Sequence, residues 1–233
     1  MTHDQNARPD APGRDWTTYY IAVSGKPARE TLLEAIGRFE RERAGKDDDR
    51  NRIALDLGCG EGRDTRALLD AGWRVVAVDP HPEAVARVRR ITGGERLDVV
   101  QASIEDLASE SVDRDASGRF PIPVAVDLVN ASFSLPFVPP SRFAVAWTWI
   151  RGMIAPGGRF CGQFFGPRDS WSSIPGRSHH DLSAVRAMLD GFAIELLRED
   201  EKDGHDAEGN PKHWHVFHVV ARRPGESSVI TLP

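Results

Sequence analysis

Short apolar runs and stretches with helical periodicity alternate along most of this chain. The apolar runs predict strands at residues 52–57, 74–79, 97–101, 124–130, 158–164, 192–198 and 213–221. Apolar residues at helical spacing predict helices at residues 62–71, 82–91, 140–154 and 181–190. Because strands and helices alternate in this way, the pattern predicts an α/β fold built on a mostly parallel sheet.

Two of the predicted strands are apolar almost throughout. Residues 74–78 read RVVAV, and residues 124–129 read VAVDLV. Strands with this composition are typically covered on both faces of their sheet. We therefore expect helices on both faces, in a single doubly wound, Rossmann-like domain.

The segments outside this alternation differ in composition. Residues 1–14 are rich in proline, aspartate and asparagine, and we predict a disordered tail there. Residues 15–50 are assigned to an N-terminal helical segment, because apolar residues recur at helical spacing over residues 27–44. Residues 51–233 are assigned to the core domain, with a polar, proline-flanked inserted loop at residues 108–123.

Composition narrows the classes of protein to consider. The 233 residues carry a net charge of −5 and no block of basic residues, so we expect no nucleic-acid partner. No apolar run is long enough to cross a membrane, and the polar start has no signal-like segment, so we expect a cytoplasmic protein. The two cysteines, Cys59 and Cys161, do not indicate a disulfide scaffold.

The most informative stretch is a glycine-rich turn between a predicted strand and helix. Residues 54–80 read ALDLGCGEGRDTRALLDAGWRVVAVDP, with glycines at Gly58, Gly60 and Gly62. Backbone N–H groups at such a helix start face a ligand, and glycine lets the ligand approach closely. The dinucleotide pattern is G-x-G-x-x-G, whereas this chain has G-x-G-x-G and places Arg63 where the third glycine would stand.

Two acidic residues accompany the turn. Asp56 precedes it, and an acid there suits a cationic or amine-bearing ligand better than a pyrophosphate. Asp79 ends the next predicted strand, where a carboxylate can accept both ribose hydroxyls of a nucleoside. Glycines that serve only tight packing are the alternative, but the two acids favour ligand binding.

These residues resemble a known family. D-L-G-C-G-E-G followed by Asp79 is similar to the first two motifs of the class I S-adenosylmethionine-dependent methyltransferases. The resemblance covers about residues 50–222 and continues in VQASIEDL, VDLVNASFSLPFV and IAPGGRFCGQFFG. Two shorter segments, DWTTYY and KHWHVFHVVARR, resemble tellurite-resistance-type and related small-molecule methyltransferases.

The resemblance implies a fold, a cofactor and a set of binding residues. It implies a seven-stranded sheet with the last strand antiparallel, S-adenosylmethionine as cofactor, and an N-terminal lid that includes Tyr20. Where the family usually has an acid before its adenine contact, this chain has Ser103, followed by Ile104. The implied cofactor-binding residues are Tyr20, Asp56, Gly58, Cys59, Gly60, Arg63, Asp79, Pro80, Ser103, Ile104 and Asn130.

The acceptor side is expected at the carboxyl ends of the parallel strands, where ligands bind in open α/β sheets. Phe133 follows the fourth predicted strand, and Arg168 and Trp171 follow the fifth, so we assign these three to the substrate site. An antiparallel last strand begins at the same edge. Its residues His213 and His215 share a face, and we predict that one of them lines the pocket as a general base or substrate contact.

The function that follows is transfer of a methyl group to a small-molecule acceptor by direct in-line displacement, which requires no covalent protein nucleophile. Histidines packed structurally in the strand are an alternative for His213 and His215. We predict no metal site, because this histidine pair lacks a third ligand with evident spacing. A nicotinamide-dependent oxidoreductase, or a cofactor-binding regulatory protein without turnover, are the alternative functions. The oligomeric state stays open.

Overall fold

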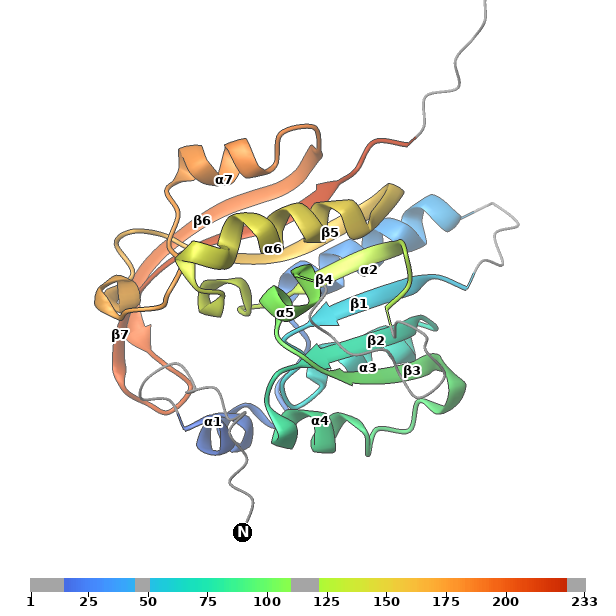
Figure 1. The fold of residues 1–233 in the computed structure, drawn as a ribbon, viewed down its shortest axis with the longest axis horizontal. Coiled ribbons are helices and arrows are strands. Elements are labelled where there is room, and N and C mark those ends of the chain that lie inside the picture. The colour runs from blue at the N-terminus through green and yellow to red at the C-terminus, as the bar shows by residue number, and fades with distance from the viewer. Residues whose placement is uncertain (1–14, 45–50, 110–121, 226–233) are drawn as a thin grey trace, which may run out of the picture.

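The computed structural model of this protein describes residues 15–44, 51–109 and 122–225. A seven-stranded sheet forms its centre, with the strand order β3-β2-β1-β4-β5-β7-β6 (Figure 1). The strands are β1 (Ile53–Leu57), β2 (Arg74–Asp79), β3 (Leu97–Gln101), β4 (Val126–Ala131), β5 (Ile154–Phe165), β6 (Ala193–His205) and β7 (Pro211–Arg222). Strand β7 pairs antiparallel with both β5 and β6, and the other pairs are parallel, which confirms the predicted sheet.

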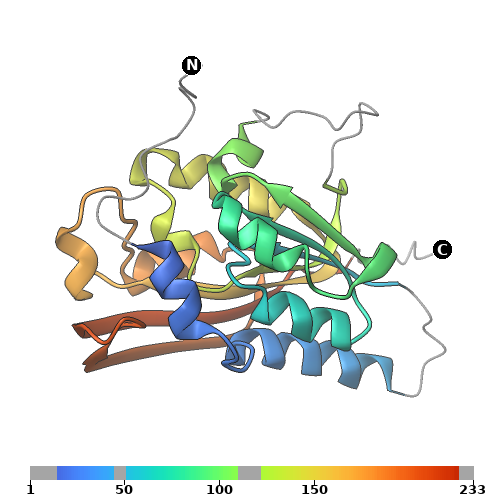
Figure 2. The ribbon, with the colours of Figure 1, turned by 90° about the horizontal axis from the view of Figure 1, so that it is seen from below.

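Helices cover both faces of this sheet, as the apolar strands indicate. The helices are α1 (Trp16–Val23), α2 (Glu30–Arg43), α3 (Arg63–Asp70), α4 (Pro82–Val88), α5 (Ile104–Ala108), α6 (Pro140–Met153) and α7 (Leu182–Met188). On one face, α2, α3 and α4 contribute Phe39, Leu68 and Val88 to a buried cluster. On the other face, α5, α6 and α7 contribute residues such as Leu107 and Ile150 (Figure 2). The prediction of a doubly wound domain is confirmed.

The strand order places a crevice at one edge of the sheet. From β1 the chain proceeds outward through β2 and β3, and then crosses back to β4 on the other side of β1. At such a switch point the connections leave in opposite directions, so a crevice opens beyond the carboxyl ends of β1 and β4. Asp56 and Asn130 are register partners on these two strands, and both therefore lie at this edge.

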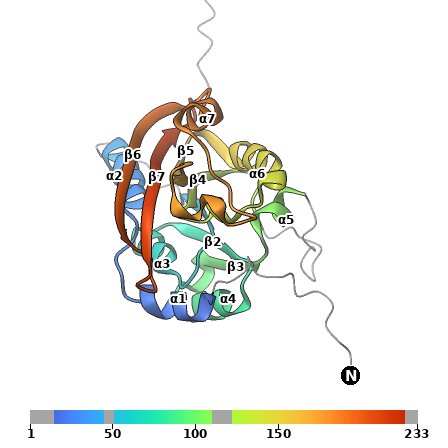
Figure 3. The ribbon, with the colours of Figure 1, turned by 90° about the vertical axis from the view of Figure 1, so that its left-hand side faces the viewer.

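Strands β6 and β7 continue beyond the rest of the sheet. Pairing between β5 and β7 ends at Phe165 and Val216, whereas β6 and β7 stay paired as far as His205 and Pro211. We call residues 201–215 the outer hairpin. It extends past the end of β5 toward α1 (Figures 1 and 3). Its residues Lys202, His205 and Trp214 line a cavity at this edge of the sheet.

The sequence misses this extension. It predicts a strand over residues 192–198, but β6 runs to His205. Residues 199–203 are all charged, which is unusual for a strand, and their outward side chains are satisfied by ion pairs instead of apolar packing. The tail at residues 1–14, most of the loop at residues 108–123 and the end at residues 226–233 lie outside the described residues. The division into an N-terminal segment and a core stays a prediction.

Candidate functional site

A cavity of about 1640 Å³ lies at the carboxyl edge of the parallel strands. One end of it, which we call the glycine-turn end, is formed by the β1–α3 turn, the ends of β2 and β3, and α1. The other, which we call the aromatic end, is formed by the segments after β4 and β5, by the outer hairpin and by Trp16 at the start of α1. The two ends belong to one continuous space, so the cavity can hold two ligands side by side.

The glycine turn is held tightly to the neighbouring strand. The N–H groups of Gly58 and Cys59 both donate to the carbonyl of Val78, at 2.8 and 2.9 Å. A Cβ at Gly58 would lie 2.4 Å from the Cβ of Ser134, so a larger residue does not fit. Gly62 begins α3 with a φ of 89°, and a Cβ there would lie 2.6 Å from the side chain of Ile91. The third glycine therefore serves helix packing although it comes one position earlier than in the dinucleotide pattern.

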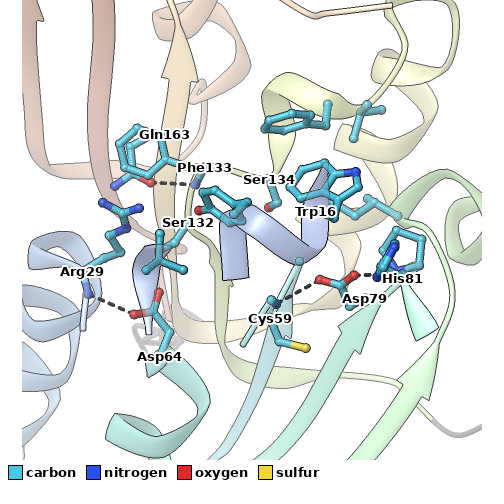
Figure 4. A pocket seen from close by; sticks show the side chains of 18 of the residues that line it. Trp16, Arg29, Cys59, Asp64, Asp79, His81, Ser132, Phe133, Ser134 and Gln163 are labelled. Atoms are coloured by element: carbon cyan, nitrogen blue, oxygen red, sulfur yellow. Dashed lines mark hydrogen bonds between the residues drawn. The ribbon is translucent and has the colours of Figure 1, made fainter. Parts of the chain in front are cut away.

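Asp79 closes the turn from the other side. Its carboxylate accepts hydrogen bonds from the backbone N–H groups of Gly60 and His81, both at 2.9 Å (Figure 4). The hydroxyl of Tyr20 on α1 hydrogen-bonds to the same carboxylate, and Asp79 is 6% exposed. Burial raises the pKa of Asp79 above its ordinary value, and the hydrogen bonds oppose that rise.

Asp56 lies in a buried polar network at the start of the crevice. Its carboxylate accepts hydrogen bonds from Thr65 Oγ1 at 2.6 Å and from Asn130 Nδ2 at 2.8 Å. Asn130 Nδ2 also lies 3.1 Å from Asp64 Oδ2. Burial, together with the negative charge of Asp64, raises the pKa of Asp56 to about 7. This acidic pair is a favourable environment for a ligand cation.

Asn130 corrects one of the site assignments. It is fully buried and is not among the residues that line the cavity, so it acts through Asp56 and Asp64 and not by contact. The cavity lining does include the other residues assigned to the cofactor: Tyr20, Asp56, Gly58, Cys59, Gly60, Arg63, Asp79, Pro80, Ser103 and Ile104.

Two of these residues also have structural roles or properties of their own. Ser103 caps α5 by accepting from the N–H of Asp106 at 3.1 Å. Burial raises the pKa of the Cys59 thiol, which argues against a reactive thiolate.

Arg29 is a cavity residue that the sequence reasoning did not identify. Its guanidinium lies 4.3 Å from the ring centre of Phe133, and its backbone N–H donates to Asp64 at 2.9 Å. Burial and the nearby charge of Arg63 lower its pKa below the ordinary value, although it stays charged. The sequence around Arg29, just before helix α2, does not indicate a role in the cavity, because its contact partners Phe133 and Asp64 come from distant segments.

The aromatic end is lined by rings in mutual contact. We define the aromatic arc as Trp16, Phe133, Phe137, Trp171 and Trp214, all of which line the cavity. Their ring centres form a chain with separations of 6.2 Å (Phe133–Trp214), 5.9 Å (Trp214–Trp171), 6.3 Å (Trp171–Phe137) and 5.1 Å (Phe137–Trp16). Phe133 and Trp171, which the sequence assigns to the substrate site, therefore lie together in the arc.

Phe133 adopts an unusual backbone conformation. Its φ is 56°, in the left-handed region that bulky residues rarely occupy. Its backbone N–H donates to Oε1 of the buried Gln163 at 2.9 Å (Figure 4). Gln163 in turn donates to Thr31 Oγ1. This network holds the ring at the junction between the two ends of the cavity.

A buried ion pair supports the wall of the arc. The ammonium of Lys212 pairs with Asp169, and both side chains are fully buried. The same ammonium lies 3.8 Å from the ring centre of Trp171 and 4.4 Å from that of Trp214. Lys212 therefore fixes the two tryptophans relative to each other.

The prediction that His213 or His215 lines the cavity is wrong, because the alternation of side chains along β7 has the opposite phase. Trp214, Val216 and His218 line the cavity, whereas His213 and His215 point to the other face. His215 packs on Gly166 and lies 2.8 Å from Glu199, and His213 lies 2.7 Å from Asp203. The histidine of this strand that does reach the cavity is His218.

Arg168 is also outside the cavity lining, contrary to its assignment as a substrate residue. Its guanidinium lies 3.0 Å from Glu199 and 2.7 Å from Glu201, on the outward face of the hairpin. Those two glutamates and His215 are close enough to share a metal ion, but an Arg168 nitrogen also lies 3.2 Å from His215 Nε2. A guanidinium thus contacts all three members of the group.

Comparison with known proteins agrees with this geometry. Residues 55–160 match a family model described as a methyltransferase domain. The chain therefore carries a methyltransferase domain over these residues. Within the ranges 15–44, 51–109 and 122–225, the chain has no helix that is long and apolar enough to cross a membrane.

Several proteins are similar to parts of this methyltransferase domain. A carboxy-S-adenosyl-L-methionine synthase of Ectopseudomonas mendocina is 33% identical over 138 residues, which are 57% of this chain and 51% of that protein. A ubiquinone biosynthesis O-methyltransferase of Azotobacter vinelandii is 33% identical over 78 residues, 33% of this chain and 32% of that protein. The chain thus spans at most about half the length of these curated relatives.

Solved structures share the fold. TehB from Haemophilus influenzae aligns with a TM-score of 0.60 and 16% identity, over 80% of this chain and 62% of that one. A Burkholderia thailandensis 1,6-didemethyltoxoflavin N1-methyltransferase, solved with S-adenosylhomocysteine, aligns with a TM-score of 0.55 and 20% identity, over 89% and 84% of the two chains. At these identities the likeness concerns the fold.

Proposed function

We propose that this protein transfers the methyl group of S-adenosylmethionine to a small-molecule acceptor by direct in-line displacement. The observation that carries the proposal is the single cavity, in which a glycine turn with two buried acids opens directly onto an aromatic chamber. The two ends offer adjacent sites for a nucleoside cofactor and an acceptor. The net charge of −5 favours a small molecule over a nucleic acid, and a cytoplasmic location stays part of the proposal.

The residues of the glycine-turn end fit this cofactor. Asp79 and the N–H groups of the turn suit a ribose, and the acidic pair Asp56 and Asp64 suits a sulfonium and an α-amino group. Four polar atoms on cavity-lining residues are buried without a hydrogen-bond partner among the described residues: Arg29 Nε, Glu61 Oε1, His81 Nδ1 and Ser134 Oγ. Buried polar atoms are normally paired, so these atoms point to a polar ligand.

In this reaction the main contribution of the protein is to position the two reactants. S-adenosylmethionine supplies a methyl group that is already electrophilic because it is attached to a sulfonium. The chain's residues hold the acceptor in line, exclude water with α1 and the outer hairpin, and fix the orientation through the aromatic arc. Such positioning contributes about 7–11 kcal/mol at best to lowering a reaction barrier.

A thermal-shift experiment tests the cofactor. S-adenosylmethionine and S-adenosylhomocysteine should each raise the melting temperature, because a ligand that binds only the folded state stabilises it by about 2.7 kcal/mol at a hundredfold excess over Kd. NAD is the matched nucleoside control and should cause no shift. A shift with NAD alone would favour the oxidoreductase instead. Binding of the methyl donor without turnover on any acceptor class would favour the regulatory alternative.

A further inference from the structure

The side of the cavity opposite the cofactor residues combines a group of aromatic rings with polar residues of the outer strands, among them Arg198, Asp200 and Lys202. Phe133, Phe137, Trp171 and Trp214 are each only half-buried although they lie in contact with one another. Because they line the cavity, their uncovered surface faces the acceptor position. Aromatic rings prefer ring partners at centre separations of about 4.5–7 Å, in offset or edge-to-face arrangements.

An aliphatic cation is a poor fit to the same rings. The ammonium of Lys212 already lies among Phe165, Trp171 and Trp214, at 5.1, 3.8 and 4.4 Å from their centres. The cation–π position between the two tryptophans is therefore taken by the chain itself. Arg198, on the hairpin side of the cavity, is neutralised by Glu30 at 2.8 Å and Asp200 at 3.0 Å, so it does not select a simple anion.

His218 stands at the end of the arc. Its ring centre lies 6.2 Å from that of Phe133, and its side chain is 14% exposed. Its Nε2 lies 3.4 Å from Asp200 Oδ2. The charged groups that face it are Asp200, Arg198 and Lys202 on β6 and Glu30 on α2. Burial lowers the pKa of His218 below its ordinary value, so the neutral ring dominates at pH 7.

We propose that the acceptor is a planar aromatic molecule with an ionisable O–H or N–H group, which the aromatic arc binds and His218 deprotonates. The inference rests on the proposed methyl transfer. With the ring proton on Nε2, which lies 3.4 Å from Asp200, the lone pair of Nδ1 takes the proton from the acceptor. The freed electron pair of the acceptor oxygen or nitrogen forms the bond to the methyl carbon, and the pair of the broken carbon–sulfur bond stays on sulfur. The imidazolium then faces the Asp200 carboxylate and returns its proton to solvent.

Acceptor classes differ in how much they need a general base and an aromatic binding surface. A thiol or an oxyanion of a soft element needs little help from a base and gains little from flat rings. A phenol or a nitrogen heterocycle needs both. The arc and His218 lie on adjoining parts of one wall, so they can serve two parts of the same molecule.

Binding tests the first half of the proposal. The protein is saturated with S-adenosylhomocysteine and screened by ligand-observed NMR against a panel of phenols and N–H heteroaromatics, each paired with its saturated counterpart, and against aliphatic thiols and amines. We expect aromatic binders whose saturated counterparts do not bind. In Trp214→Leu and Phe133→Leu their affinity should fall about tenfold, while Trp149→Leu, which lies outside the cavity on α6, keeps it.

The controls separate the two proposals. A thermal shift with S-adenosylhomocysteine in all three variants reports folding and cofactor binding together. If the wild-type protein fails to bind S-adenosylhomocysteine, the proposed function is wrong. If it binds this product but recognises no aromatic compound, or recognises saturated counterparts, thiols or amines equally well, the acceptor inference alone is wrong.

Kinetics test the second half, on the aromatic binders that are methylated. His218→Asn should lower turnover by about 10²–10⁴-fold and remove the acid limb of the pH–rate profile, which in the wild type lies below the ordinary histidine pKa. Binding of the same compound should change little. Unchanged turnover and an unchanged profile in a folded His218→Asn protein would overturn the role of His218.

Discussion

The two ends of the cavity are encoded in different ways. The glycine-turn end comes mostly from one continuous stretch, because Asp56, the turn and Asp79 lie within residues 54–80. The aromatic end is assembled from α1, the segments after β4 and β5, and the outer hairpin, which are far apart in the sequence. The difference indicates that the proposed cofactor site is encoded as a local motif, whereas the residues of the proposed acceptor site come together only when the chain folds.

The largest effect that tests this comparison is expected at Asp79. Replacing it with alanine removes a charged acceptor for the ribose and releases the N–H groups of Gly60 and His81. Charge-assisted hydrogen bonds contribute about 1.5–3 kcal/mol, so calorimetry should show about 10–100-fold weaker binding of S-adenosylhomocysteine.

Asp98→Ala is the matched control for Asp79. Asp98 is on the neighbouring strand β3, pairs with Arg74 at 2.8 Å and does not line the cavity. Its replacement should leave S-adenosylhomocysteine binding unchanged. Equal affinities in the two variants would show that the ribose is held elsewhere, and that the local motif does not define the cofactor end.

A pH effect is expected at Asp56. Its pKa is raised from 3.8 to about 7, so the folded protein binds a proton there that a cationic ligand must displace. Affinity for S-adenosylmethionine should therefore rise with pH between 5 and 7, by up to about tenfold per pH unit. The stability of the ligand-free protein depends on pH in the opposite direction, because folding raises the pKa of Asp56. The stabilisation that protonated Asp56 contributes is complete below the unfolded pKa of 3.8 and is lost as pH rises through about 7.

Calorimetry at several pH values checks this expectation. Asp56→Asn should flatten the dependence on pH, because the amide does not titrate in this range. A pH-independent affinity in the wild-type protein would mean that the Asp56 carboxylate is not coupled to the ligand cation.

The smallest effects are expected on the outward face of β7. His215→Asn should lower the free energy of unfolding by about 1–2 kcal/mol, since the buried ring loses its contacts with Glu199 and Arg168. His213→Asn should change it by no more than about 0.5 kcal/mol, because this side chain is exposed. Chemical denaturation measures both. Both variants should bind S-adenosylhomocysteine as the wild type does, and a loss of binding in either would place that histidine back in the cavity.

The histidines show where prediction from the sequence stops. The strand, its antiparallel direction and its approach to the cavity are all predictable from the pattern and the family resemblance. Which of two alternating faces turns inward depends on the pairing register with β5 and β6, and a shift of one residue exchanges the faces. The apolar residues of β7 do not decide it, since Trp214 and Phe217 lie on opposite faces.

Other differences have equally physical causes. Asn130 lies at the correct strand end, but full burial makes it a partner of Asp56 and not a ligand contact. Arg168 follows β5 as predicted, and Glu199 and Glu201 draw it outward. By contrast, the backbone hydrogen bonds that hold the glycine turn and the Asp79 carboxylate lie within residues 54–81, so their arrangement follows from one continuous stretch of sequence.

The outer hairpin beyond β5 has a consequence for how such a protein can diversify. Most of its backbone hydrogen bonds join β6 to β7, and it is tied to the segment after β5 through the N–H of Gly166, which donates to the His215 carbonyl at 2.7 Å, and through the Lys212–Asp169 pair. None of these contacts involves the other strand pairings or the glycine turn. Yet it supplies Lys202, His205 and Trp214 to the cavity. The proposed function thus assigns part of the acceptor preference to this hairpin. Exchanging residues 201–215 between homologous domains should therefore change which acceptor is used while binding of S-adenosylhomocysteine is kept.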